Sequence, residues 1–211
     1  MWSPGEPLPN DQAGRSAVRD WLIQKIEQAF ADVRIDGGVT LSEVAAIELG
    51  AGPEKRALAR QRDRYRHWSE ILLDERDPTR GALHWMDATG YAFHVPAYLV
   101  SWLRTSIVGL DGFDADAHGL ETLFLPSLLD ESDWIREKQV NLTTEQRRTI
   151  ALSLLLCLAC EEDEAWTTDR EGMVRSLSCN WLDALRSTER ASAIRRWPEL
   201  GPAGSVDRDR D

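Results

Sequence analysis

Cysteine, lysine and histidine are scarce in this chain of 211 residues, which contains three, three and four of them. Three cysteines, an odd number without framework spacing, exclude the class of small disulfide-stapled domains. Long hydrophobic runs are missing too. The longest covers residues 150–160 and is interrupted by Ser153, whereas a membrane-spanning helix needs roughly 20 apolar residues. We therefore expect a protein of the reducing cytoplasm that does not enter a membrane.

The motifs of several enzyme classes are also absent. The sequence has no G-x-S-x-G nucleophile elbow, no glycine-rich phosphate-binding loop and no H-E-x-x-H zinc motif. Its 36 carboxylates are too many for a general acid–base pair to be selected by spacing alone. The first interpretation is therefore a protein without a catalytic residue, a metal or a cofactor.

Negative charge dominates the residues that are present. Asp and Glu number 36 against 25 Lys and Arg, and the net charge is −11. Residues 111–164 alone hold 13 acidic and 4 basic residues. This excess disfavours nucleic acid and anionic lipid as partners. It indicates either a solvated surface that keeps the protein soluble or a surface that receives a basic protein.

Hydrophobic spacing predicts a single domain that is mainly helical. Apolar residues recur with a helical period in residues 18–33, and Thr40-Leu-Ser-Glu43 is a capping box for a second helix. The segment 144–161 is apolar nearly all round beyond Ile150, so we expect it at the buried centre. Thr143 and Gln146 form the capping pair of this helix.

The domain boundaries follow from composition. Residues 1–14 are rich in proline and glycine and predict a disordered lead-in, and the polar residues 198–211 predict a flexible tail. One globular domain is expected at 15–197. Trp2 and Trp197 lie in weakly patterned ends, where they are either exposed contact residues or folded back on the core.

A small β-hairpin is expected at about 82–95. The aromatic-rich runs 82–86 and 91–95 flank Asp87-Ala-Thr-Gly90, which is typical of a turn between short strands. Pro96 then suits the first turn of a following helix. With this hairpin the fold class is mainly α, or α+β in strict terms.

The segment Gly90-Tyr-Ala-Phe-His-Val-Pro-Ala-Tyr-Leu99 resembles a family of small bacterial proteins of unknown function. The later Leu142-Thr-Thr-Glu-Gln146 is similar to the start of an apolar helix in the same family. The resemblance covers roughly 16–160 and implies helices around a small hairpin. It supplies no activity, cofactor or catalytic residue. A toxin-neutralising or regulatory role is an analogy with other acidic bacterial proteins.

The first functional hypothesis is a non-catalytic protein-binding module, such as an immunity-type inhibitor or a regulatory partner. Its acidic side chains would occlude a basic site on the partner protein. The candidate residues are Asp111, Asp114, Asp116, Glu161, Glu162, Asp163 and Glu164.

Two alternatives remain open. The first is a hydrolase-like or metal-dependent enzyme that uses His84 or His118 with nearby carboxylates. The hairpin register places His84 and His94 on opposite faces, so the two should not share an ion. The loop that contains His118 starts like a calcium loop, but Leu125 stands where the bidentate glutamate is required. The second alternative is a subunit of a larger assembly.

Two further patterns have plain structural explanations. Cys157 and Cys160 lie at the end of an apolar helix, where cysteine packs as a small hydrophobe more often than it acts in redox chemistry. Arg56, Arg60 and Arg64 share one helical face. In an acidic protein this face is expected to pair with the acidic region 111–164 or to be solvated, and an acidic protein partner stays as an alternative.

Overall fold

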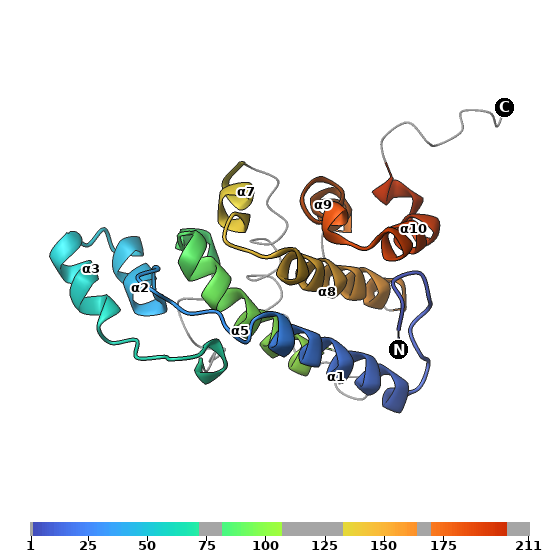
Figure 1. Cartoon of the computed structure of the whole chain (residues 1–211), viewed down its shortest axis with the longest axis horizontal. Helices are drawn as coiled ribbons and strands as arrows, with labels where there is room; N and C mark the ends of the chain where they lie inside the picture. The colour runs from blue at the N-terminus through green and yellow to red at the C-terminus, as the bar shows by residue number, and fades with distance from the viewer. Residues whose placement is uncertain (1, 72–81, 107–132, 164–169, 202–211) are drawn as a thin grey trace.

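Three long helices form the centre of the protein: α1 (Gln12–Ala29), α5 (Ala88–Ser106) and α8 (Thr144–Asp163) (Figure 1). Helix α1 packs against the other two. This computed structural model describes residues 2–71, 82–106, 133–163 and 170–201. Within these ranges the secondary structure is helical, and none of the helices is both long and apolar enough to cross a membrane.

Helix α8 is the buried central element that its apolar residues predicted. Every residue from 150 to 160 is buried. The hydroxyl groups of Thr149 and Ser153 donate to carbonyl oxygens one turn earlier, at 2.8 and 3.0 Å, so these buried polar groups are satisfied. The predicted capping pair is confirmed: the Gln146 amide donates to Thr143 Oγ1 at 3.2 Å, and Gln146 Oε1 accepts from the Thr143 amide at 2.8 Å.

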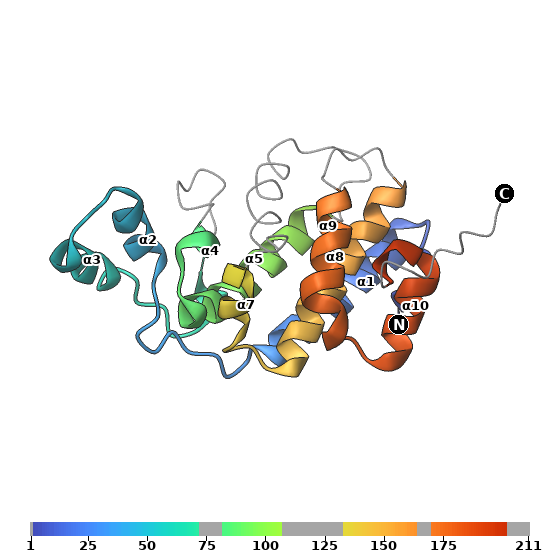
Figure 2. The ribbon, with the colours of Figure 1, turned by 90° about the horizontal axis from the view of Figure 1, so that it is seen from above.

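The C-terminal helices cover one side of α8. Figure 2 shows α9 alongside it. Arg148 on α8 reaches Glu189 on α10 through two hydrogen bonds of 2.9 and 2.5 Å. Burial raises the pKa of Glu189, but these hydrogen bonds outweigh it and hold the pKa below its usual value. The elements are α9 (Arg170–Ser176), the π-helical turn η3 (Leu177–Trp181), η4 (Leu182–Ala184), α10 (Ser187–Arg196) and η5 (Pro198–Leu200).

The N-terminal residues pack on the body of the protein, where the sequence had indicated a lead-in. Trp2 and Leu8 belong to the hydrophobic core, and the Arg196 guanidinium on α10 donates to the carbonyl oxygen of Glu6. Trp2 and Trp197 are both buried, so the expectation of exposed contact residues is wrong and the folded-back alternative holds. The physical reason is that an indole offers a large apolar surface to the core, and Trp2 also satisfies its Nε1 by donating to the Glu6 carbonyl oxygen at 3.0 Å.

Two other boundary predictions can be compared with the structure. The predicted tail from residue 198 begins with η5, whose Leu200 is buried, and residues 202–211 lie outside the described part of the chain. Cys157 and Cys160 are buried in α8, in agreement with a packing role, and Cys179 is exposed.

The β-hairpin predicted at 82–95 is not seen. These residues form α4 (Ala82–Trp85) and the first two turns of α5. The Asp87 carboxylate accepts a hydrogen bond from the Gly90 amide at 2.7 Å, as a helix N-cap does, so this segment starts a helix and does not turn a hairpin. Pro96 lies inside the helix. Residues 90–100 are buried on every side, and a helix buried all round shows no amphipathic period in its sequence.

Helix α7 (Asp133–Gln139) is fastened to the start of α5. The Lys138 ammonium donates to the Met86 carbonyl oxygen, and Asn141 Nδ2 donates to Thr89 Oγ1 at 3.1 Å. Burial lowers the pKa of Lys138, and the negative charge of Asp87 partly opposes that shift. Lys138 and Asn141 therefore connect the start of α5 to α7 and to the residues that follow α7.

His94 on α5 is a buried histidine that the fold keeps neutral. Its Nδ1 lies 2.8 Å from the Gly90 carbonyl oxygen, and its Nε2 is buried without a hydrogen-bond partner among the described residues. Burial lowers the pKa of His94 to about 4, although the Gly90 hydrogen bond, Asp63 and Asp87 act in the opposite direction. In the unfolded chain the pKa returns to about 6.5.

This difference predicts acid sensitivity between the two pKa values. Between these values the unfolded chain binds a proton on His94 that the folded chain excludes. The contribution of His94 to the free energy of unfolding is therefore fully present above pH 6.5 and decreases as the pH falls toward 4. The loss from pH 7 to pH 5 should be about 2 kcal/mol. Urea unfolding of the wild type and of His94→Gln at both pH values measures it. The gap between the two proteins should shrink by that amount, and an unchanged gap would contradict the assignment.

Candidate functional site

Helices α2 (Leu41–Glu48) and α3 (Pro53–Arg60) form a helical hairpin at one end of the molecule (Figure 1). The connecting turn is encoded locally. Gly50 adopts a φ of 68°, the left-handed conformation with which helices commonly end, and Pro53 occupies the first turn of α3. Helix α3 packs mainly against α2, and α2 also contacts α4.

A groove of about 860 Å³ runs along this hairpin. Its apolar lining includes Ala45, Ala46, Leu49 and Leu58. Leu49 is 87 % exposed and Leu58 is 61 % exposed, and they are two of the four large hydrophobic residues exposed in the described part of the chain. We call this the α2–α3 groove. It brings two of these four exposed side chains into one cavity.

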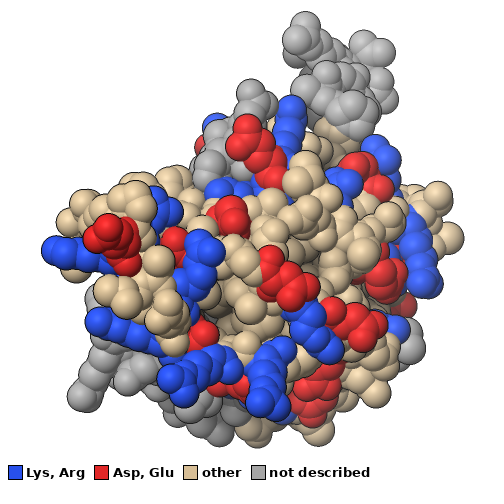
Figure 3. Space-filling model, turned by 60° about the vertical axis from the view of Figure 1, so that its left-hand side comes forward, with Lys and Arg blue, Asp and Glu red and all other residues tan. Residues whose placement is uncertain are grey.

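Charged side chains border the α2–α3 groove. Lys55 and Arg62 line it together with Glu54. Figure 3 turns this end of the molecule forward and shows Lys and Arg side chains spread over it, with Asp and Glu side chains and uncharged surface between them. The groove therefore combines an apolar floor with a mainly basic border.

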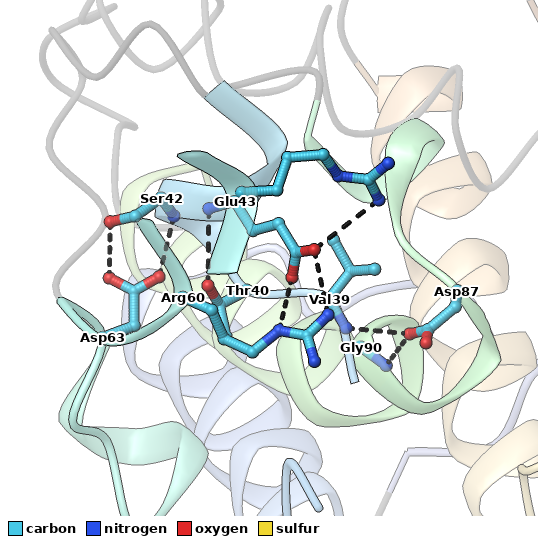
Figure 4. Close-up of polar contacts among 9 residues, drawn as sticks. Val39, Thr40, Ser42, Glu43, Arg60, Asp63, Asp87 and Gly90 are labelled. Carbon is cyan, nitrogen blue, oxygen red and sulfur yellow. Dashed lines mark hydrogen bonds and ion pairs between the residues drawn. The ribbon is translucent and has the colours of Figure 1, made fainter. Parts of the chain in front are cut away.

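A buried carboxylate holds the two helices of the hairpin together (Figure 4). Glu43 on α2 is 2 % exposed. Its two oxygens accept from Nε and Nη2 of Arg60 at 2.7 and 2.9 Å, and Arg56 Nη2 lies 3.6 Å from Oε1. The hydrogen bond to Glu43 raises the pKa of Arg60 above its ordinary value. This bidentate geometry fixes the angle of α3 on α2 as well as contributing energy.

A second carboxylate joins the start of α2 to the segment after α3. Asp63 accepts from the Ser42 amide and from the Ser42 hydroxyl, both at 2.7 Å (Figure 4). The Thr40 hydroxyl accepts from the Glu43 amide at 3.4 Å and caps α2, as the sequence predicted. The Glu43 side chain turns to Arg60 on α3.

Both ends of the hairpin are anchored to the body. On one side, Asp87 Oδ1 accepts from the Val39 amide at 3.0 Å while it caps α5. The backbone approaches so closely there that a Cβ on Gly90 would lie 2.4 Å from the Val39 carbonyl oxygen. On the other side, Trp68 in η1 (Trp68–Glu70) is buried, and its Nε1 donates to the Phe30 carbonyl oxygen at 3.0 Å.

A model of a protein family of unknown function, DUF6714, matches residues 18–182. The chain belongs to the DUF6714 family. The match runs from within α1 to the first residue of η4 and therefore contains the whole α2–α3 groove with its anchors. No curated protein and no solved structure matches the chain. A family of unknown function agrees with the resemblance described above, and the motif at 90–99 on which that resemblance was based remains a prediction.

Four of the seven acidic residues predicted to bind a partner lie outside the described part of the DUF6714 chain. Asp111, Asp114 and Asp116 fall within 107–132, and Glu164 falls within 164–169. Glu161, Glu162 and Asp163 belong to the last turn of α8, and their side chains are not described. The role of these residues stays a prediction.

The enzyme hypothesis uses His84 or His118, and of these two the structure describes His84. His84 is exposed on α4, where its ring packs edge-on against Trp85 with centroids 5.5 Å apart. His94 is fully buried, and His118 lies outside the described residues. Within the described ranges, no group of three or more His, Cys, Asp or Glu side chains could hold a metal ion.

The arginine face has a partner that the sequence did not reveal. Arg56 and Arg60 were expected to pair with the acidic region 111–164 or to be solvated, and the structure places both on Glu43. Glu43 occupies the third helical position after Thr40, so its spacing indicated a capping role within its own helix. The sequence showed that α3 carries positive charge, opposite to that of Glu43. It could not show that α3 packs against α2.

Replacing Glu43 by Gln should loosen the hairpin in the DUF6714 domain. The variant loses a buried charge and leaves Arg60 with a weaker acceptor, so we expect a loss of about 2 kcal/mol, less than for a fully buried pair because Arg60 is partly exposed. Glu48→Gln on the same helix is the matched control, because Glu48 is exposed and should change stability by about 0.5 kcal/mol or less. Urea unfolding measures both, and equal effects would contradict the structural role of Glu43.

The close approach at Gly90 gives a second stability prediction. Gly90→Ala places a methyl group against the Val39 backbone and should cost about 2 kcal/mol. The control is Gly52→Ser. A Cβ there meets nothing within 4 Å, and the new hydroxyl can cap α3, so stability should stay constant or rise by a few tenths of a kcal/mol. An unchanged melting temperature for Gly90→Ala would show that the hairpin does not rest on α5 in this way.

Proposed function

We propose that the chain is a non-catalytic protein-binding module whose binding surface is the α2–α3 groove. The observation that carries this proposal is the pair of exposed leucines, Leu49 and Leu58, in one groove. Single exposed leucines are ordinary on protein surfaces, whereas apolar side chains gathered in one cavity with a charged border are typical of interaction sites.

The energy available at this groove is sufficient for specific binding. Complete burial of a leucine side chain contributes about 1.5–3 kcal/mol, so Leu49 and Leu58 together could supply about 3–6 kcal/mol before other contacts are counted. Interfaces commonly derive most of their affinity from a few such residues. Two leucines on adjacent helices can therefore serve as the central contacts of a protein interface.

The scaffold of the groove also favours binding. Glu43 and Asp63 fix α3 against α2, and Asp87 fixes the hairpin on α5. A surface that is ordered before binding loses little conformational entropy when the partner arrives. The polar network therefore supports a recognition surface without requiring a catalytic group.

An immunity-type inhibitor, a regulatory partner or a subunit of a larger assembly would each use such a surface. The acidic residues of 111–164 stay a separate prediction of a second contact region for a basic partner. The enzyme alternative stays a prediction, since His84 is exposed beside Trp85 and His118 lies outside the described residues.

Site-specific photo-crosslinking in the native cells tests the proposal. A photoreactive amino acid at position 54, beside the leucines in the groove, should capture a defined partner. The double substitution Leu49→Gln and Leu58→Gln should reduce capture at least about tenfold, because two apolar contacts are lost. Both leucines are exposed, so the melting temperature should not change.

Val140→Gln is the matched control for this experiment. Val140 is 74 % exposed but lies outside the groove, between α7 and α8, so its replacement should leave capture unchanged. Capture that depends on Leu49 and Leu58 but not on Val140 supports the proposal. The same crosslinked proteins in the wild type and in both variants, or none in the wild type, would refute it.

A further inference from the structure

We infer that the α2–α3 groove receives one amphipathic helix of the partner protein, with acidic residues beside its apolar face. This inference rests on the proposed function and adds the chemistry of the partner. Its support comes from the shape of the groove, from its lining and from the charges at its border.

The lining of the groove selects a helix among the recurring forms of peptide recognition. A bound strand needs an open sheet edge, and the described residues contain no strand. A polyproline segment needs an aromatic-lined groove, and the described lining of the α2–α3 groove contains no aromatic residue. Two helices with an apolar groove between them accept a third helix, which packs its own apolar side chains against Leu49 and Leu58.

The dimensions of the hairpin agree with this occupant. Helices α2 and α3 have eight residues each, so each is about 12 Å long. A ligand helix that crosses the groove can present apolar residues at positions i, i+3, i+4 and i+7 over this length. Leu49 near the end of α2 and Leu58 within α3 would contact opposite sides of that apolar stripe.

The charge of the hairpin decides which helices are accepted. Residues 41–66, which contain both helices and the segment after them, hold six basic and four acidic residues in a chain whose net charge is −11. Arg56 and Arg60 are engaged by Glu43, and Asp63 is engaged by Ser42. Lys55 and Arg62 line the groove against the single carboxylate of Glu54, so its border favours acidic side chains on the ligand.

The overall negative charge of the chain acts against an acidic ligand only at long range. At physiological ionic strength exposed charges are screened beyond about 8 Å. Lys55 and Arg62 would meet the ligand within that distance, so the local contacts decide the preference. The same screening predicts that affinity for an acidic helix decreases as salt is added.

A selection from displayed peptides tests the inference on the full chain. A library of randomised 14-residue helical peptides is selected on the wild type after depletion on the Leu49→Gln, Leu58→Gln double variant. Recovered sequences should carry Leu, Ile or Phe at helical spacing and an excess of Asp and Glu beside them. Fluorescence anisotropy then compares one recovered peptide with versions in which its acidic residues become Gln or Lys.

Charge reversal on the protein completes the test. Lys55→Glu with Arg62→Glu should weaken the acidic peptide about tenfold and strengthen its Lys version. Arg195→Glu is the control, since Arg195 is exposed on α10 at the opposite end of the molecule, and it should leave both affinities unchanged.

The outcomes separate this inference from the proposed function. Recovered peptides without an acidic excess, or equal affinities for the acidic and Lys versions, overturn the acidic partner. Recovered peptides without helical spacing, or an empty selection, overturn the helical occupant. In each case crosslinking that still depends on Leu49 and Leu58 preserves the proposed function, whereas crosslinking that is independent of them defeats the proposed function itself.

Discussion

The Asp87 carboxylate connects the two parts of this structure. One of its oxygens accepts hydrogen bonds from the Gly90 amide, which starts α5, and from the Val39 amide, which leads into α2. A Cβ on Gly38 would lie 2.6 Å from the Gly90 amide nitrogen, so both backbone segments meet where only glycine fits. The position of the α2–α3 hairpin, and hence of its groove, depends on this junction.

The hairpin divides its interactions between polar groups that hold it and apolar groups that remain open. Glu43, Arg60 and Asp63 provide specific contacts between α2, α3 and the segment after α3, and Glu43 is buried while Arg60 is partly exposed. Leu49 and Leu58 contribute little to that framework and stay exposed. A small hairpin normally buries such leucines to stabilise itself, because burial is the main favourable term in folding. Here the polar contacts hold α3 against α2 instead, so the leucines are available to a partner.

Sequence patterns were informative where one element's own residues decide its structure. The Thr143 and Gln146 pair and the apolar run 150–160 predicted α8 correctly, and Thr40 capped α2 as expected. The same reasoning failed at 82–95, because α5 is buried on all sides and its aromatic residues show no helical period. It left two alternatives open for Trp2 and Trp197, because their burial depends on contact between the two ends of the chain, which are remote in sequence.

The sequence by itself determined a helical class, the buried central helix, the acidic net charge and the absence of several catalytic motifs. These properties follow from composition and from spacing within single elements. The tertiary structure alone decided that Asp87 caps a helix and that Glu43 pairs with Arg60. It also decided that Leu49 and Leu58 share one exposed groove. Hydrophobic spacing states which residues can be buried, whereas the packing of other elements determines which of them are covered.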